Sequence, residues 1–118
     1  MGQMQIIHAG RTDTGIVREH NEDAFIVDER TSLHVVCDGV GGRRGGAEAS
    51  RVATEWIAHR VREGAAILDA ATDSPSGVSR RAVGQLFEAA ISEASGQIRR
   101  AAAGNPELVG MATTVVGV

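Results

Sequence analysis

The chain has 118 residues, of which 42% are hydrophobic, 23% are charged and only 3% are aromatic. This length suits one domain with an aliphatic core, because single cores commonly span about 100 to 150 residues. The net charge is −3 and the 12 basic residues, all arginines, are scattered along the chain, which argues against a nucleic-acid partner.

Cysteine content and apolar patterning indicate the compartment. Cys37 is the only cysteine, so the chain can form neither an intrachain disulfide nor a cysteine cluster for zinc, which fits a reducing compartment. The N-terminus does not resemble a signal peptide, and every apolar run is far shorter than the roughly 20 residues that span a bilayer. We therefore expect a soluble, cytoplasmic protein without membrane insertion, with Cys37 packed as a small buried hydrophobe.

The first half of the chain predicts three short strands, at Met4–Ala9, Ala24–Asp28 and Leu33–Cys37. The polar residues 30–32 predict a hairpin connection between the second and third. Residues 24–27 show no polar alternation, which indicates that both faces of that strand meet apolar material.

The second half of the chain predicts mainly helices. Apolar residues at helical spacing predict one helix over Ala47–Glu63 and a longer one that begins near Ser79 as a candidate N-cap and stops at Gly104. Between them, residues 69–77 are rich in turn-forming types and predict an exposed loop. Residues 111–118 resemble the opening of another strand.

Acidic residues gather at the ends of the second and third predicted strands. Glu22 and Asp23 precede one strand, and Asp38 ends the other and is followed by Gly39, which lets backbone approach a ligand closely. Carboxylate oxygens suit Mg²⁺ or Mn²⁺, and the guanidinium of Arg18 suits a phosphate, so the pattern favours phosphate-ester hydrolysis at a pair of ions bridged by Asp38. The alternative is solvated acids in turns beside a surface arginine, and spacing alone does not decide between the two.

Two other candidate sites are weaker. The glycine-rich residues 39–46 lie between a strand and a helix, but Arg44 stands where a dinucleotide loop needs its third glycine, and no lysine follows to make a P-loop. The four histidines show no metal-ligand spacing and are expected to be structural or surface residues; they are His8, His20, His34 and His59.

Four sequence blocks occur in a characteristic order: TDTGIVREHNEDAF at 12–25, VVCDGVGG at 35–42, GAEAS at 46–50 and GMATT at 110–114. Together they resemble the metal-dependent type 2C protein phosphatases, the PPM family, especially its bacterial members. The resemblance implies an α+β fold, an α-β-β-α sandwich of two antiparallel sheets flanked by helices. Residues 1–118 would be the N-terminal part of a single catalytic domain, with further metal-binding aspartates in a C-terminal part outside the chain.

The resemblance also implies roles for single residues. Asp38 would bridge two Mn²⁺ or Mg²⁺ ions, Gly39 would ligate through its carbonyl, and Glu22 would ligate directly or through water. Asp23 would be an outer acid that does not touch the ions, and Arg18 would grip the phosphoryl group. Water held between the ions would then hydrolyse phosphoserine or phosphothreonine in proteins, the products of a Ser/Thr kinase. Some relatives carry a histidine after Asp-Gly where this chain has Val40, so the general acid is unassigned.

The chain by itself is expected to be inactive, because the family's remaining acids fall outside it. One rival hypothesis is a non-catalytic phosphatase-like binding or regulatory module. A further expectation is self-association through an uncovered sheet, since open sheet faces and edges are prone to pair.

Overall fold

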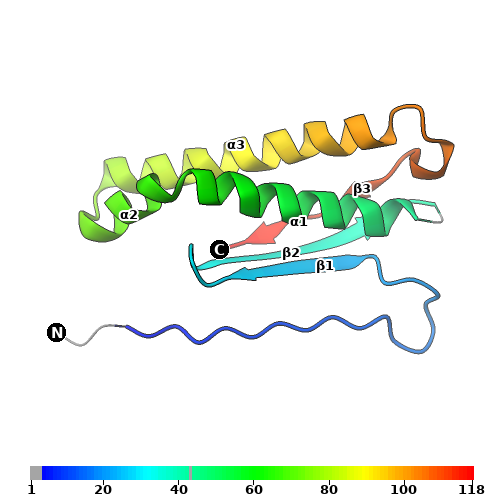
Figure 1. Ribbon diagram of the computed structural model, residues 1–118, viewed down its shortest axis with the longest axis horizontal. Coiled ribbons are helices and arrows are strands. Elements are labelled where there is room, and N and C mark those ends of the chain that lie inside the picture. The colour runs from blue at the N-terminus through cyan, green and yellow to red at the C-terminus, as the bar shows by residue number, and fades with distance from the viewer. Residues whose placement is uncertain (1–3, 43) are drawn as a thin grey trace.

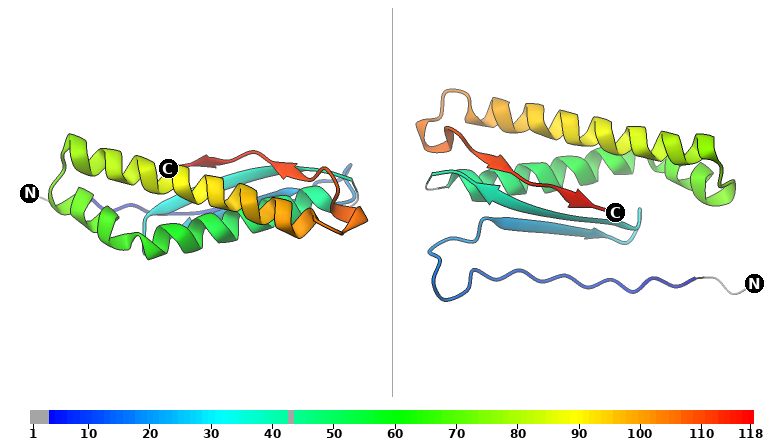
Figure 2. Two further views of the ribbon diagram at one scale, coloured as in Figure 1. Left: turned by 90° about the horizontal axis from the view of Figure 1, so that it is seen from above. Right: turned by 180° about the vertical axis from the view of Figure 1, so that it is seen from behind.

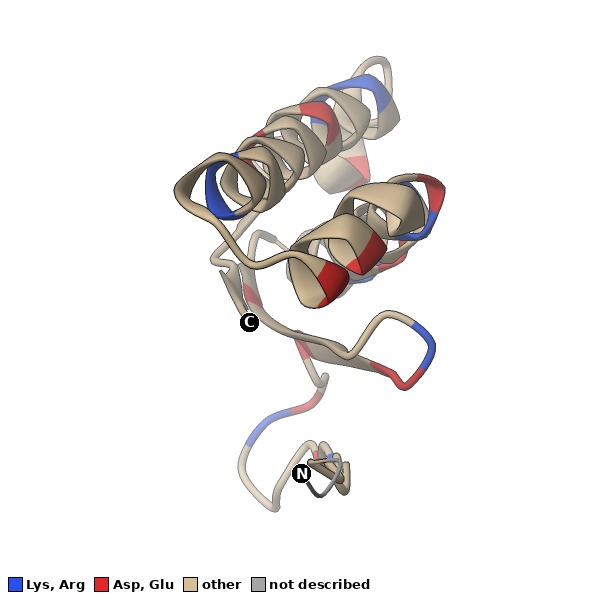
Figure 3. Ribbon diagram, turned by 90° about the vertical axis from the view of Figure 1, so that its left-hand side faces the viewer, with Lys and Arg blue, Asp and Glu red and all other residues tan. Residues whose placement is uncertain are grey.

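The computed structural model describes residues 4–42 and 44–118, which form three layers (Figures 1 and 3). Helices cover one face of an antiparallel sheet, and the N-terminal segment runs past the other face. In chain order the elements are β1 (Asp23–Asp28), β2 (Leu33–Val40), α1 (Gly45–Glu63), α2 (Ala65–Asp73), α3 (Gly77–Ala102), a 3₁₀ turn (Pro106–Leu108), β3 (Ala112–Thr113) and β4 (Val116–Gly117).

Strand β2 is the centre of the sheet. It pairs antiparallel with β1 on one side and with β3 and β4 on the other. Its side chains alternate: Leu33, Val35 and Cys37 are at most 2% exposed and face the helices, whereas Asp38 lies on the opposite face. The strands predicted at 24–28 and 33–37 are therefore confirmed, and Cys37 is the buried hydrophobe that we expected.

The helical layer consists mainly of α1 and α3, which run antiparallel side by side over the sheet (Figure 2). Ile57 of α1 is fully buried and Ala90 of α3 packs in the same cluster, so small and branched aliphatic residues fill the core in place of aromatic ones. Both predicted helices are confirmed. Within the described part of the chain, no helix is both long enough and apolar enough to cross a membrane.

The loop predicted at 69–77 is wrong, because most of it belongs to helix α2. Alanine has the highest helix propensity, and the run from Ala65 to Ala71 outweighs the turn-forming residues that follow it. The helix ends only at Asp73, just before Ser74 and Pro75, so the connection to α3 is confined to residues 74–76.

The N-cap of α3 is Ser76 and not Ser79 as predicted. The Ser76 hydroxyl accepts the Ser79 N–H at 3.0 Å, and the Ser79 hydroxyl accepts the Ser76 N–H at 2.8 Å. This reciprocal pair is a capping box in which Ser79 is the third helical residue. The predicted stop is correct, since α3 ends at Ala102 and Gly104 adopts φ +72°.

The two terminal strands differ from the predictions. Residues 4–9 run extended but form no strand, because no neighbouring strand among the described residues offers them a hydrogen-bond ladder. The segment meets the sheet through His8, whose ring stacks on His34 with centroids 4.5 Å apart. Residues 111–118 form two short strands, β3 and β4, where one continuous strand was predicted.

An ion pair between the buried Asp28 and the half-exposed Arg62 joins the β1–β2 hairpin to the last turn of α1. Asp28 is only 6% exposed, and its carboxylate accepts hydrogen bonds from Arg62 Nε at 2.7 Å, from the Thr31 hydroxyl at 3.0 Å and from the Arg30 N–H at 3.1 Å. Burial alone would raise the pKa of Asp28, but these three hydrogen bonds outweigh it and hold the pKa below its usual value of 3.8.

This pair predicts a loss of stability in acid. Because the folded pKa is depressed, the contribution of Asp28 is fully present above the unfolded value and is lost as pH falls through the folded value. We expect Asp28→Asn to lower the unfolding free energy by about 1–3 kcal/mol at neutral pH, and by progressively less as pH falls below the usual pKa of 3.8 and through the depressed folded pKa. Urea titrations across this range measure the difference, and Asp69→Asn, an exposed acid of α2, is the control. A deficit that does not change with pH would contradict the prediction.

Candidate functional site

The acids at the strand ends lie opposite each other in the sheet. Asp23 of β1 is the cross-strand partner of Asp38 of β2. The next pair along is hydrogen-bonded, since Gly39 donates its N–H to the Glu22 carbonyl at 2.9 Å. Bonded and non-bonded pairs alternate in an antiparallel ladder, so Asp23 and Asp38 form a non-bonded pair, the kind with the closer side chains. Antiparallel pairing thus brings together acids that are fifteen residues apart.

A pocket of about 190 Å³ contains these carboxylates and the predicted phosphate-binding arginine. Its lining residues come from β1, β2 and the loop before β1: Asp13, Thr14, Arg18, His20, Asn21, Glu22, Asp23 and Asp38. The Asn21 side chain stabilises the loop, because it donates to the Thr12 hydroxyl at 2.8 Å and accepts from the Asp23 N–H at 3.0 Å. The structure therefore brings Arg18, Glu22, Asp23 and Asp38 into one place.

The pocket carries excess negative charge. Partial removal from water, and then the charge of Asp38 and the hydrogen bond shared with it, raise the pKa of Asp23, while Arg18 acts in the opposite direction. Glu22 adds a smaller repulsion of the same sign. Like charges held this close favour a bound proton or a bound cation.

Two glycines allow the strand and the helix to approach each other beneath the acids. A Cβ on Gly39 would overlap the carbonyl oxygen of Gly46 at the start of α1 and would lie 2.8 Å from the carbonyl oxygen of Glu22. A Cβ on Gly46 would lie 2.7 Å from the Glu22 carboxyl group. The absence of side chains at Gly39 and Gly46 therefore lets β2 and α1 pack closely and sets the position of Glu22.

The backbone of Gly39 is only half paired on the side of β1. Its N–H bonds to Glu22, but among the residues that the structure describes the return bond, from the Glu22 N–H to the Gly39 carbonyl, is not formed. A carbonyl without its ladder partner remains available to water or to a cation. This observation suits the expectation that Gly39 ligates through its carbonyl.

The donor chemistry fits a hard divalent cation, because every candidate ligand is an oxygen. The geometry is incomplete, however. Within residues 4–42 and 44–118, no three acid, histidine or cysteine side chains converge closely enough to hold a metal ion by themselves. The fit therefore depends on the Asp23–Asp38 pair, the nearby Glu22 and the free Gly39 carbonyl.

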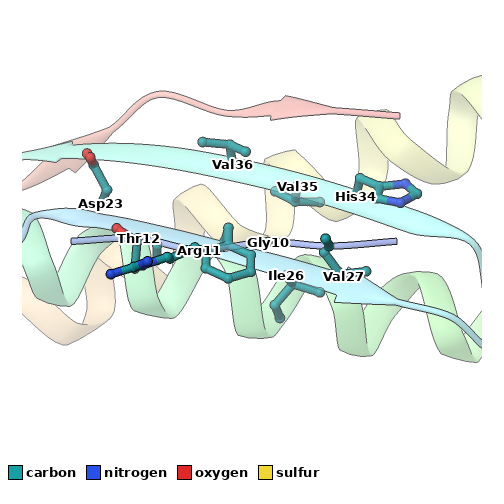
Figure 4. Close-up of a pocket in the computed structure, with 12 residues that line it drawn as sticks. Gly10, Arg11, Thr12, Asp23, Ile26, Val27, His34, Val35 and Val36 are labelled. Atoms are coloured by element: carbon teal, nitrogen blue, oxygen red, sulfur yellow. The ribbon is translucent and has the colours of Figure 1, made fainter. Parts of the chain in front are cut away.

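A second cavity, of about 250 Å³, lies between the N-terminal segment and the sheet (Figure 4). Figure 4 shows Val27 and Val36 along it, with Asp23 at one end and His34 at the other. Its lining is mostly apolar and holds no second acid, so the chemistry belongs to the acidic pocket. Of the histidines, only His20 lines that pocket, where it is exposed.

Several residues of the site escaped the sequence analysis. Asp13, Thr14 and Asn21 line the pocket or stabilise its loop, and Thr114 bonds to the backbone of Asp38 through its N–H at 2.9 Å and its hydroxyl at 3.2 Å. Asp13 and Asn21 lie within the first of the four sequence blocks, residues 12–25, and Thr114 ends the last one, residues 110–114. Their membership of these blocks was the available signal, but it does not reveal what each side chain contacts.

Comparison with known proteins shows the family to which the chain belongs. A family model described as protein phosphatase 2C matches residues 15–118. The serine/threonine phosphatase stp of Listeria innocua is 31% identical over 109 residues, which cover 90% of this chain and 39% of that protein. The serine/threonine protein phosphatase PstP of Mycobacterium tuberculosis is 32% identical over 111 residues, which cover 94% of this chain and 18% of the PstP sequence.

A solved structure supports the same relationship. The crystal structure of the M. tuberculosis serine/threonine phosphatase PstP/Ppp superposes with a TM-score of 0.68 at 30% identity, over 91% of this chain and 39% of the crystallised one. This chain therefore spans well under half the length of the relatives that it matches.

Proposed function

Because the chain belongs to the protein phosphatase 2C family, we propose that its parent protein hydrolyses phosphoserine and phosphothreonine in proteins with Mn²⁺ or Mg²⁺ as cofactor. The parent protein is the longest polypeptide in which these 118 residues occur. The observation that carries the proposal is the pocket in which Glu22, Asp23, Asp38 and Arg18 meet. A cytoplasmic location remains part of the proposal.

Each residue has a distinct task in the hydrolysis. The planar guanidinium of Arg18 matches two phosphoryl oxygens and orients the ester. Asp38, Glu22 and the Gly39 carbonyl would hold the cations, and Asp23 interacts with Asp38 from the opposite strand. A water oxygen bonds to phosphorus while the bond from phosphorus to the seryl or threonyl oxygen breaks; the water gives up one proton and the departing oxygen takes one up, so that inorganic phosphate and the free alcohol are the products. Divalent cations supply the electrostatic part of this chemistry by polarising the phosphoryl oxygens and making water more acidic.

Removal of divalent ions tests the proposal directly. We expect the parent protein to release phosphate from a phosphoserine peptide in the presence of Mn²⁺, to lose this activity in EDTA, and to regain it when Mn²⁺ is added back in excess. A phosphotyrosine peptide of matched sequence tests the substrate class, and we expect it to react more slowly. Activity that is unchanged by EDTA would contradict the assignment of the cofactor.

The isolated 118-residue chain is a separate case. We propose that it is inactive, since the described residues contain no complete three-ligand cluster. If the parent protein also fails to hydrolyse any phosphopeptide in Mn²⁺, the alternative of a non-catalytic binding or regulatory module is favoured. Phosphate release measured side by side for the two proteins distinguishes these outcomes.

The sheet face opposite the helices suggests self-association of the isolated chain. Although the N-terminal segment runs past this face, Val36 is still 56% exposed and its cross-strand neighbour Val116 is 69% exposed, so part of the apolar surface on adjacent strands remains open to solvent. We propose that two copies cover this face for each other. Light scattering over a dilution series is expected to show a dimer that dissociates, and Val36→Thr to weaken it; a monomer at every concentration would contradict this.

A further inference from the structure

Thr114 lies directly opposite Asp38 on the side of β2 that faces away from β1. Thr113 is paired with Gly39 and Val116 with Val36, so the same register places Thr114 against Asp38. Further along, His34 and Val118 exchange both N–H to carbonyl bonds, each 2.9 Å long. Pairs that share two backbone hydrogen bonds recur at every second residue of an antiparallel ladder. Two backbone hydrogen bonds are therefore expected between Asp38 and Thr114.

Only one of those two backbone bonds is present. The Thr114 N–H donates to the Asp38 carbonyl at 2.9 Å, as the ladder requires. The Asp38 N–H, however, donates to the Thr114 hydroxyl oxygen at 3.2 Å. The Thr114 carbonyl is occupied elsewhere, since it accepts the Thr113 hydroxyl at 2.9 Å. A side-chain hydroxyl has therefore replaced a backbone carbonyl, where the assigned strands β3 and β4 are interrupted.

We propose that the Thr114 hydroxyl is a positioning group that holds the Asp38 backbone, and through it the Asp38 carboxylate, in the geometry for a divalent cation. Both hydrogen-bonding groups of the Asp38 peptide on this side are held by Thr114, through the N–H and the hydroxyl. The other side of Asp38 offers no ladder bond, because its pair with Asp23 is of the non-bonded kind. In the described part of the chain, the backbone hydrogen bonds of Asp38 are therefore all made to a single residue.

The inference rests on the proposed function, since it assigns a role in cation binding at the same pocket. Outer partners that orient a metal ligand commonly change metal affinity by about 10- to 100-fold when they are replaced. Valine has nearly the same shape as threonine but lacks the hydroxyl, whereas serine keeps the hydroxyl but lacks the methyl group. These two substitutions separate the hydrogen bond from the packing.

The test uses the 118-residue chain and needs no catalysis. Mn²⁺ is titrated into wild type, Thr114→Val and Thr114→Ser, and paramagnetic broadening of the amide NMR signals of Glu22, Asp38 and Gly39 is followed. We expect the concentration for half-broadening to rise at least about 10-fold in Thr114→Val and to stay within about 3-fold of wild type in Thr114→Ser. The control is Thr72→Val, which removes an exposed hydroxyl of α2 that bonds to the Leu68 carbonyl, far along the chain from Asp38; its midpoint is expected to stay that of wild type.

Hydrogen exchange of the Asp38 amide is the second measurement. It is expected to be faster in Thr114→Val than in wild type or Thr114→Ser, because only valine leaves this N–H without its partner. Equal Mn²⁺ midpoints and equal exchange in wild type and Thr114→Val would overturn the positioning role, as would equal weakening in Thr114→Ser. If Mn²⁺ fails to broaden these signals even in wild type, the role of Thr114 toward a cation is overturned for this chain, whereas the proposed function is tested separately by the Mn²⁺-dependent activity of the parent protein.

Discussion

Asp38→Asn is expected to reduce the Mn²⁺-dependent phosphatase activity of the parent protein by at least about a thousandfold. Asparagine keeps the size of the side chain and leaves the two bonds between the Asp38 backbone and Thr114 in place, but it removes the negative charge that holds a cation. Cation-based stabilisation of a transition state amounts to several kcal/mol, and each loss of about 1.4 kcal/mol is a factor of ten in rate. Initial rates on a phosphoserine peptide at saturating Mn²⁺ measure the effect.

The stability of the same variant should change in the opposite direction. Like charges directly across a strand pair are destabilising, and Asp38 raises the pKa of Asp23. Removing one of the two charges is expected to raise the unfolding free energy by about 0.2–1 kcal/mol in the absence of metal. A gain in stability together with a loss of activity marks a site built for function at the expense of stability.

Asp28→Asn is the matched control for this experiment. It makes the same chemical change at the other end of the β1–β2 hairpin, where the carboxylate is bonded to Arg62 and lies outside the acidic pocket. We expect it to lose stability and to keep its activity below its unfolding temperature. Full Mn²⁺-dependent activity in Asp38→Asn would show that Asp38 holds no catalytic cation.

The elements that the sequence predicted correctly are those with a strong period. Strand β2 alternates cleanly between Val35 and Cys37 on the helix face and Val36 and Asp38 on the other, while α1 and α3 repeat their apolar residues at helical spacing. In these segments local propensity and burial point to the same structure. The resemblance to type 2C phosphatases, confirmed by the family match, predicted how such elements would be layered.

The errors occur where neighbouring signals compete or where the outcome depends on a distant partner. In α2, alanines compete with the turn-forming residues 72–75, and helix propensity prevails up to Asp73. For residues 4–9 the composition favours a strand, but a strand needs a ladder, and the described chain provides none there. Propensity alone does not show whether a partner strand is present.

The site was partly predictable for a related reason. Glu22, Asp23 and Asp38 flank two strands joined by a short hairpin, so antiparallel pairing had to bring them together. Thr114 reaches Asp38 from 76 residues away, which no local pattern reveals. The close approach of the Gly46 backbone to the Glu22 carboxyl group likewise depends on how α1 docks onto the sheet.

Gly39→Ala is expected to be the most destabilising single-methyl change in the site, costing about 3 kcal/mol or more of unfolding free energy. Its new Cβ would overlap the Gly46 carbonyl oxygen and lie 2.8 Å from that of Glu22, and backbone atoms cannot swing away as a side-chain end can. Overpacking against surroundings that do yield typically costs about 1–3 kcal/mol. The separation of β2 from α1 and Glu22 should also displace the acids and abolish the Mn²⁺-dependent broadening of the Glu22 and Asp38 signals.

Alanine substitutions at two further glycines of the same segment are expected to cost less stability than Gly39→Ala. A Cβ on Gly46 would meet the movable carboxyl end of Glu22 at 2.7 Å and the Gly39 carbonyl carbon at 3.0 Å, so Gly46→Ala should cost less stability than Gly39→Ala while still moving Glu22. Gly42→Ala meets no atom within 4 Å and should change stability by less than about 0.5 kcal/mol. Urea unfolding of the three variants is expected to rank them in that order. If Gly39→Ala were as stable as Gly42→Ala, the close approach of β2 and α1 would not be what positions Glu22, and Glu22 would have to be held by the loop before β1 alone.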